Sequence, residues 1–177
     1  MPRRSQVDGP SYFHVLNRSV RRDRLFDKAA DYQAFVDALR MAQVRVPVPI
    51  LAYCIMPNHF HLVVGPAHLA VLSRFMHRLT LVHATRWHRH RKSTGTGPVY
   101  QGRFKSYPIR DETHFLFVCR YVERNPLRAE LVARAEQWPW SSLGRDCKIC
   151  NLELTAWPIP RPSAWLELVN EGGDRVS

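Results

Sequence analysis

Two histidines separated by one residue, His59 and His61, stand out as the side chains best suited to chemistry. Alternate side chains of a β-strand lie on the same face of its sheet, so in a strand both imidazoles point one way and Phe60 points the other. Neutral imidazole is a common metal ligand, and two on one face can share an ion. The pair therefore indicates a metal site, while a partly exposed pair that binds nothing is the simpler alternative.

A tyrosine and an asparagine four residues apart, Tyr121 and Asn125, form the second candidate group. On a helix they lie on one face, one turn from each other. An amide oxygen can complete a site for a hard metal ion, and a phenol can be a nucleophile. If this face meets the histidines, Tyr121 could attack a phosphate whose oxygen the ion polarises. Taken singly, Tyr121 is better explained as a core residue, and Asn125 as the N-cap of a helix starting at Pro126.

A β-hairpin over residues 50–64 is expected to present the histidines. Residues 50–55 form an apolar run, Pro57 and Asn58 are typical turn residues, and a second apolar run follows. The histidines then lie at the start of the second strand.

The elements around this hairpin follow an order that predicts an α+β fold. Strand, helix, strand, strand, helix, strand and a final helix are typical of the split βαβ arrangement, an antiparallel sheet with helices packed on one face. The other expected elements are a strand at 11–17, a helix from Asp27 or Asp31, a helix from Leu69, a strand at 104–109 and a helix at 114–125 opened by Asp111 or Thr113.

The charge balance favours a polyanionic partner. The sequence has 26 lysines and arginines against 15 acidic residues, a formal net charge of +11. Nucleic acid is the first candidate, because arginines, lysines, aromatics and glycines are mixed between residues 74 and 105. A solvated basic face is the alternative. The predicted nucleic-acid-binding residues are Arg74, Arg78, Arg86, Arg89, Arg91, Lys92, Arg103 and Lys105.

The ordered set of motifs resembles one known family, the REP-associated tyrosine transposases, within the single-tyrosine HUH transposases. The resemblance covers most of residues 11–142. Asparagine four residues after the tyrosine favours this branch, since its insertion-sequence relatives carry glutamine there. The motifs are His14 and Asn17, Met56-Pro-Asn-His-Phe-His-Leu-Val-Val64, Gln101-Gly-Arg-Phe-Lys105, Tyr121, Asn125-Pro-Leu-Arg-Ala129 and Trp140-Ser-Ser142.

This resemblance implies a ferredoxin-like domain that acts on single-stranded DNA carrying a foldback hairpin. It implies His59, His61 and Asn125 as ligands of Mg²⁺ or Mn²⁺ and Tyr121 as the nucleophile. Attack on a phosphodiester would leave a 5′-phosphotyrosine and a free 3′-hydroxyl. It favours a monomer with its site within one chain; a dimer in which Tyr121 serves a partner's histidines is the alternative. A domesticated protein that binds DNA hairpins without cleaving them is the competing function.

Three regions are expected along the chain: a flexible basic arm at 1–10, the transposase domain at 11–142 and a tail at 143–177. The tail is rich in tryptophan and proline and is expected to wrap the domain, with a short helix near 163–170. No apolar run reaches the length of a membrane span, so a cytoplasmic protein associated with the nucleoid through DNA is expected.

The cysteines favour structural roles. Cys54 and Cys119 lie in apolar segments and are expected to be reduced core thiols. Cys147 and Cys150 have the spacing of half a zinc site, but no second pair follows them.

Overall fold

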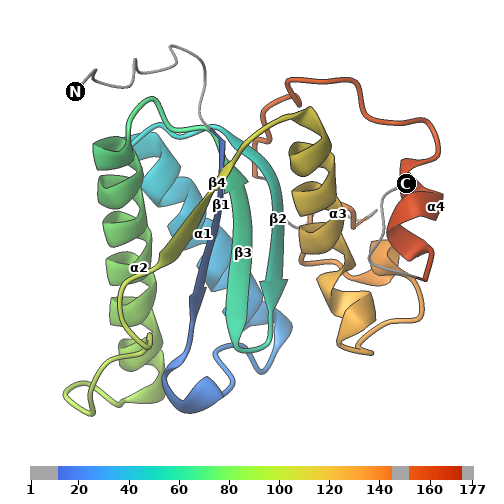
Figure 1. Ribbon diagram of the computed structural model, residues 1–177. Helices are drawn as coiled ribbons and strands as arrows, with labels where there is room; N and C mark the ends of the chain where they lie inside the picture. Colours follow the sequence, from blue (N-terminus) through green and yellow to red (C-terminus); the bar gives the residue numbers. More distant parts are fainter. Residues whose placement is uncertain (1–11, 145–151, 173–177) are drawn as a thin grey trace.

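A four-stranded antiparallel sheet with the order β2-β3-β1-β4 lies at the centre of the molecule (Figure 1). The computed structural model describes residues 12–144 and 152–172. Pro57 and Asn58 join two of the strands, which confirms the predicted hairpin. The strand order is that of the split βαβ arrangement. The strands are β1 (Tyr12–Arg18), β2 (Ile50–Met56), β3 (His59–Val64) and β4 (Lys105–Ile109).

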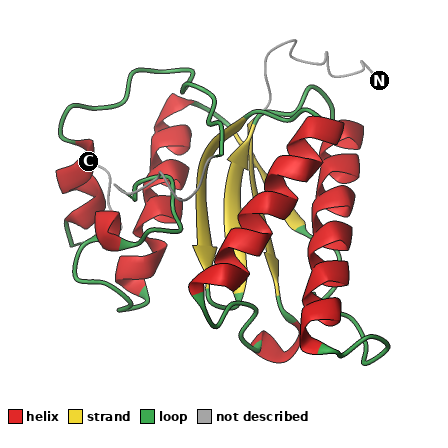
Figure 2. Ribbon diagram, turned by 180° about the vertical axis from the view of Figure 1, so that it is seen from behind, coloured by secondary structure: helices red, strands yellow, loops and turns green. Residues whose placement is uncertain are grey.

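Two long helices, α1 (Ala29–Arg45) and α2 (Leu69–Arg91), cover one face of the sheet (Figure 2). Phe60 and Leu62 of β3 point to this face and join Phe35 of α1 in the larger apolar core. The period of two along the strand therefore places these residues on the opposite side from the histidines.

The other face is covered by α3 (Glu112–Arg128), with the short helix α4 (Trp165–Asn170) beside it. Cys54 of β2 and Val63 of β3 point to this face and pack against α3 in a second apolar core. The prediction of helices on one face thus holds for α1 and α2, the helices of the split βαβ unit. The helix that follows the last strand packs on the opposite face, which is the face of the histidines.

The helix starts were only partly predicted. Asp111 caps α3, because its Oδ1 accepts a hydrogen bond from the backbone N–H of His114 at 2.8 Å. The N-cap of α1 is Lys28, and neither predicted aspartate takes that place. Asp31 lies in the first turn instead, where its carboxylate accepts from the backbone N–H of Lys28 at 3.3 Å.

Asn125 is not the cap of a new helix, and that explanation was wrong. α3 continues through Pro126 and ends at Arg128, and the Asn125 carbonyl accepts from the N–H of Ala129 at 3.0 Å. A proline so close to the C-terminal end costs the helix one hydrogen bond. Its ring is buried, and this packing offsets the loss.

The segment after α3 covers the outer edge of β2. The N–H of Ile55 donates to the carbonyl of Trp140 at 2.8 Å, and the N–H of Ser142 donates to the carbonyl of Tyr53 at 2.9 Å. Further on, the N–H of Thr155 donates to the carbonyl of Ile50 at 2.8 Å. The backbone groups of an edge strand are thereby paired, which protects the sheet from pairing with another chain.

The tail packs against the α3 face through tryptophans. Trp165 of α4 and Trp157 contact each other edge to face, with ring centroids 5.0 Å apart. Inside this contact, the buried Glu123 of α3 accepts from Trp165 Nε1 and from Ser142 Oγ, each at 2.7 Å. The short helix near 163–170 is confirmed, while the boundary at 143 stays a prediction.

Cys54 and Cys119 are buried free thiols, as expected. Cys147, Cys150 and the arm at 1–10 lie outside the described residues. No helix within the described residues is long and apolar enough to cross a membrane. Two short 3-10 turns, Val20–Arg22 and Ala135–Gln137, complete the elements.

Candidate active site

His59 and His61 lie side by side at the start of β3, on the sheet face that α3 covers. Their ring centroids are 4.9 Å apart, and His61 is only 3% exposed. The sheet pairs His61 with Leu16 of β1, and this central position holds its backbone on both sides. The predicted geometry, with both imidazoles on one face and Phe60 in the opposite core, is what the strand produces.

The turn residue Asn58 orients His59. The Asn58 Nδ2 donates to the carbonyl of Arg22 at 3.0 Å. The Asn58 Oδ1 is therefore the atom that lies 2.6 Å from His59 Nδ1. An amide oxygen only accepts, so His59 carries its proton on Nδ1 and a lone pair on Nε2. A hydrogen bond of this kind is the usual support for a metal-binding histidine.

His14 of β1 orients His61 in a similar way. The two rings are stacked with centroids 5.1 Å apart, and His14 Nε2 lies 2.9 Å from His61 Nδ1. His61 Nε2 is buried and has no hydrogen-bond partner within the described residues. A buried polar atom without a partner costs folding free energy, so it marks a place where a ligand would bind.

Tyr121 of α3 lies against both of these histidines. Its ring centroid is 5.7 Å from that of His14 and 5.7 Å from that of His61. One turn later, the buried Asn125 donates from Nδ2 to the Tyr121 carbonyl at 2.8 Å. The Arg128 guanidinium lies 5.0 Å from the Tyr121 ring centroid. One face of α3 thus carries the phenol, the amide and a positive charge next to the histidine pair.

Burial keeps the site histidines neutral. Burial first, and then the nearby His114 and Arg18 respectively, lower the pKa of His14 and of His59 to about 4. For His61, burial drives the pKa well below its usual range. Neutral imidazoles keep a lone pair for a metal at physiological pH.

These side chains fit a divalent metal ion. His59 Nε2 has an available lone pair, His61 Nε2 is unpartnered, and the Asn125 amide lies on the facing helix. Within the described residues, no group of three or more His, Cys, Asp or Glu side chains has the arrangement of a metal site. An asparagine amide oxygen is a donor of the kind that can complete such a ligand set.

Sequence reasoning named His14 among the motifs that carry the family resemblance but gave it no place in the site. A single histidine in an apolar strand has no spacing that points to chemistry. Its place beside His61 results from the pairing of β1 with β3, which joins segments 47 residues apart. The resemblance was therefore the signal that could have drawn attention to it.

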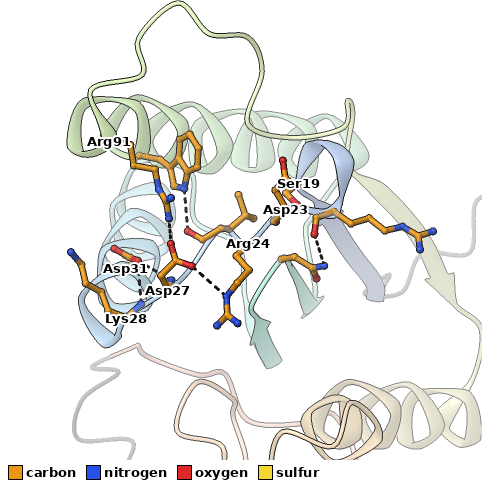
Figure 3. Close-up of polar contacts among 11 residues, drawn as sticks. Ser19, Asp23, Arg24, Asp27, Lys28, Asp31 and Arg91 are labelled. Atoms are coloured by element: carbon orange, nitrogen blue, oxygen red, sulfur yellow. Dashed lines mark hydrogen bonds and ion pairs between the residues drawn. The ribbon is translucent and has the colours of Figure 1, made fainter.

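The basic end of α2 is engaged with the start of α1 (Figure 3). Arg91 pairs with Asp27, and its guanidinium lies 4.6 Å from the Trp87 ring centroid. Arg86 Nη2 lies 3.0 Å from the sulfur of Met41. These arginines already have partners within the protein, and DNA would have to compete with them.

The other predicted cations of α2 lie across the sheet from Tyr121. Arg74, Arg78 and Arg89 are on α2, and Lys92 follows its last residue in a left-handed conformation with φ of 51°. Because α2 and α3 cover opposite faces, these side chains are not part of the group around Tyr121. Their contact with DNA stays a prediction.

Arg103 and Lys105 lie closer to the site. They line a hollow at the end of β1 and β4 together with Arg18 and Arg22, and Tyr107 closes one side. We call this the basic hollow. Because Arg18 is paired with His59 in the sheet, this lining residue of the hollow lies beside His59. Arg103 and Lys105, which the sequence predicted, are therefore joined here by Arg18 and Arg22, which it did not single out.

Comparison with known proteins assigns the family. Residues 10–125, more than half of the chain, match the family model described as IS200-like transposases. The chain therefore belongs to the IS200-like transposase family. Within this family its similarity is to the REP-associated tyrosine transposases, the branch that the motifs indicated.

Two curated relatives support that branch, and one solved structure supports the fold. A REP-associated tyrosine transposase of Escherichia coli K12 is 24% identical over 153 residues, covering 81% of this chain and 82% of the relative. A Haemophilus influenzae protein described as a candidate REP-associated tyrosine transposase is 26% identical over 155 residues, covering 82% and 86%. The solved structure of a REP-associated tyrosine transposase bound to a REP hairpin superposes with a TM-score of 0.60 at 20% identity, covering 92% and 97%. This likeness establishes the common fold.

Proposed function

We propose that the protein is a metal-dependent single-strand DNA endonuclease and strand transferase that acts on hairpin-forming repeat DNA. The observation that carries this proposal is the position of Tyr121 against the His14–His61 pair, with ring centroids 5.7 Å from each. A nucleophile that attacks a phosphate held at His59 and His61 has to lie beside those histidines, and Tyr121 lies against the ring of His61.

In the proposed reaction the Tyr121 Oη attacks phosphorus while the bond from phosphorus to the 3′-oxygen breaks. The phenol loses its proton, the departing 3′-oxygen gains one, and the 5′-phosphate stays on the tyrosine. Rejoining is the reverse attack by a 3′-hydroxyl, so the ester is conserved and no nucleotide cofactor is consumed. Arg128, beside the phenol ring, contributes positive charge where negative charge develops.

We assign His59, His61 and Asn125 as the residues that would hold Mg²⁺ or Mn²⁺. When bound, such an ion polarises a phosphate oxygen and offsets the charge that forms on it. Asn58 and His14 keep the two imidazoles oriented, through hydrogen bonds of 2.6 and 2.9 Å. The rigid strand positions the ligands, and the facing helix supplies the nucleophile.

A DNA hairpin is the proposed partner. The structurally similar transposase was solved with a REP hairpin. The basic hollow beside the histidines, lined by Arg18, Arg22, Arg103 and Lys105, suits a sugar-phosphate backbone. Tyr121 lies beside histidines of its own chain, which supports a site in cis and a monomer as the working assembly. Activity on chromosomal repeats places the protein in the cytoplasm, at the nucleoid.

The decisive experiment uses labelled single-stranded DNA with the palindromic repeats that flank the gene. Wild-type protein with Mg²⁺ or Mn²⁺ is expected to give a covalent adduct on a denaturing gel, and EDTA is expected to abolish it. Tyr121→Phe is expected to lose the adduct and to bind the same DNA with nearly unchanged affinity. Adducts that survive in Tyr121→Phe would exclude this nucleophile. Tight, structure-specific binding with no cleavage in either metal would support a binding protein without turnover.

A further inference from the structure

A second hollow adjoins the basic hollow and contains the proposed nucleophile. Tyr107 and Leu16 line both hollows, so the two adjoin along β1 and β4, and together we call them the trench. The second hollow has a volume of about 580 Å³ and is also lined by Tyr121 and Phe117. We call it the aromatic hollow.

Two aromatic rings in the aromatic hollow face solvent. Tyr107 is 50% exposed and Phe117 is 40% exposed, whereas the aromatic side chains of the cores are buried. β4 is the edge strand of the sheet, and its pairing places Tyr107 directly opposite His14, with ring centroids 6.1 Å apart. The exposed Tyr107 ring is thereby held on a strand, next to His14 of the neighbouring strand, and His14 in turn contacts Tyr121.

The trench has the charge of a nucleic-acid channel. Arg18, Arg22, Arg103 and Lys105 lie in the basic hollow, and Arg110 lines the aromatic hollow. Among the described residues that line either hollow, none carries a carboxylate. Proteins bind single-stranded nucleic acid by combining cationic side chains, which contact the phosphates, with aromatic rings, which stack on the bases.

We infer that Tyr107 stacks on the unpaired nucleobase next to the cleaved phosphodiester, with Phe117 on the far side of the aromatic hollow. The ligand is thus single-stranded DNA, and the strand continues from this base into the basic hollow. This inference rests on the proposed function and adds to it a residue that places the scissile phosphate. Stacking accepts any base, because every base has a π-face, so Tyr107 contributes to position more than to sequence choice.

The test compares intact DNA with DNA that lacks a single base. The cleaved phosphodiester is mapped with the wild-type protein on the repeats that flank the gene, and substrates then carry an abasic site on either side of it. For wild type, one of these substrates is expected to lower kcat/KM for adduct formation about 10- to 100-fold, the loss expected for one base–aromatic stack. Tyr107→Leu is expected to show the same loss on intact DNA and no further loss on the abasic substrate.

Two other variants separate stacking from folding. Tyr107→Trp keeps a ring and is expected to stay within about three-fold of wild type, since every aromatic side chain can stack on a base. Leu81→Ala removes another half-exposed apolar side chain, on α2, and is expected to change nothing. Two outcomes would overturn the inference. In one, the abasic substrate lowers kcat/KM of Tyr107→Leu as much again as it lowers that of wild type. In the other, Tyr107→Trp and Tyr107→Leu lose kcat/KM equally.

A binding measurement keeps the inference testable if the DNA is not cleaved at all. The same oligonucleotides, with 2-aminopurine placed at successive unpaired positions, are bound to the Tyr121→Phe protein in EDTA. At one position, the fluorescence of 2-aminopurine is expected to fall when the bound protein carries Tyr107. The fluorescence is expected to recover when Tyr107→Leu is added to the same Tyr121→Phe protein. If no position depends on Tyr107, the subsite is excluded. This result is independent of whether Tyr121 is a nucleophile.

Discussion

The two faces of the sheet carry buried histidines in opposite situations. On the α1/α2 face, His83 lies in the larger core and its Nδ1 is 2.7 Å from the hydroxyl of the buried Tyr100. On the α3 face, His61 is equally buried, but its Nε2 has no partner within the described residues. The His83 contact uses a ring nitrogen within the fold, whereas His61, in the part of the chain that the structure describes, keeps an unpartnered ring nitrogen on the face that α3 covers. Among buried histidines, an unpartnered ring nitrogen rather than burial alone is therefore the sign of a candidate binding site.

The largest effect expected from this contrast is on metal binding. His61→Leu removes a proposed ligand and is expected to weaken Mn²⁺ binding at least 100-fold, as measured by titration calorimetry. It is expected to leave the fold intact, because the leucine fills the buried space. His83→Leu is the matched control: it leaves the Tyr100 hydroxyl unpaired at a cost of about 1–3 kcal/mol in urea unfolding, with Mn²⁺ affinity unchanged. Unchanged Mn²⁺ affinity in His61→Leu would exclude the site.

A smaller effect is expected at His14, which contacts the proposed ligand but is not one. Loss of an outer partner of a metal-binding histidine commonly costs 10- to 100-fold in affinity, so His14→Leu is expected to weaken Mn²⁺ binding by about that factor. His14→Gln keeps an oxygen that can accept from His61 Nδ1, and it is expected to restore most of the affinity. Equal affinities in the leucine and glutamine variants would show that His14 acts only through packing.

A third effect, on stability and not on metal binding, concerns the dependence of the free energy of unfolding on pH. Burial lowers the pKa of His83 to about 4, so the folded state resists a proton that the unfolded state accepts below about pH 6.5. The stabilisation is complete above that pH and is lost as the pH falls from about 6.5 to 4, by about 3 kcal/mol. Urea unfolding of the metal-free protein at pH 7 and pH 4.5 measures this change.

The matched variant for this pH effect is His83→Gln, whose side chain can still bond the Tyr100 hydroxyl but does not titrate. Its free energy of unfolding is expected to fall less between pH 7 and pH 4.5 than that of wild type. Part of the decline remains, because the pKa values of His14 and His59 are lowered in the same way. An identical decline in the variant would show that His83 is not the titrating group.

Local sequence predicted the hairpin, the order of the elements along the chain and the α2 and α3 segments, because apolar periodicity and turn residues act within a few positions. It failed at Asn125, where a residue before proline normally leaves the helical region. The packing of α3 against the sheet outweighed that local preference. The helical face shared by Tyr121 and Asn125 follows from that unbroken helix.

The amino-acid sequence by itself determined which side chains could do chemistry: an alternating histidine pair, a tyrosine and an asparagine one turn apart, and an excess of arginine. Only the tertiary structure decided which of them meet. Pairing of β1 with β3 brought His14 to His61, and the packing of α3 on the histidine face brought Tyr121 to both. The α2 arginines lie across the sheet from Tyr121, whereas the exposed Tyr107 lines a hollow together with it. Such contacts join segments far apart in the chain, and local propensity carries no information about them.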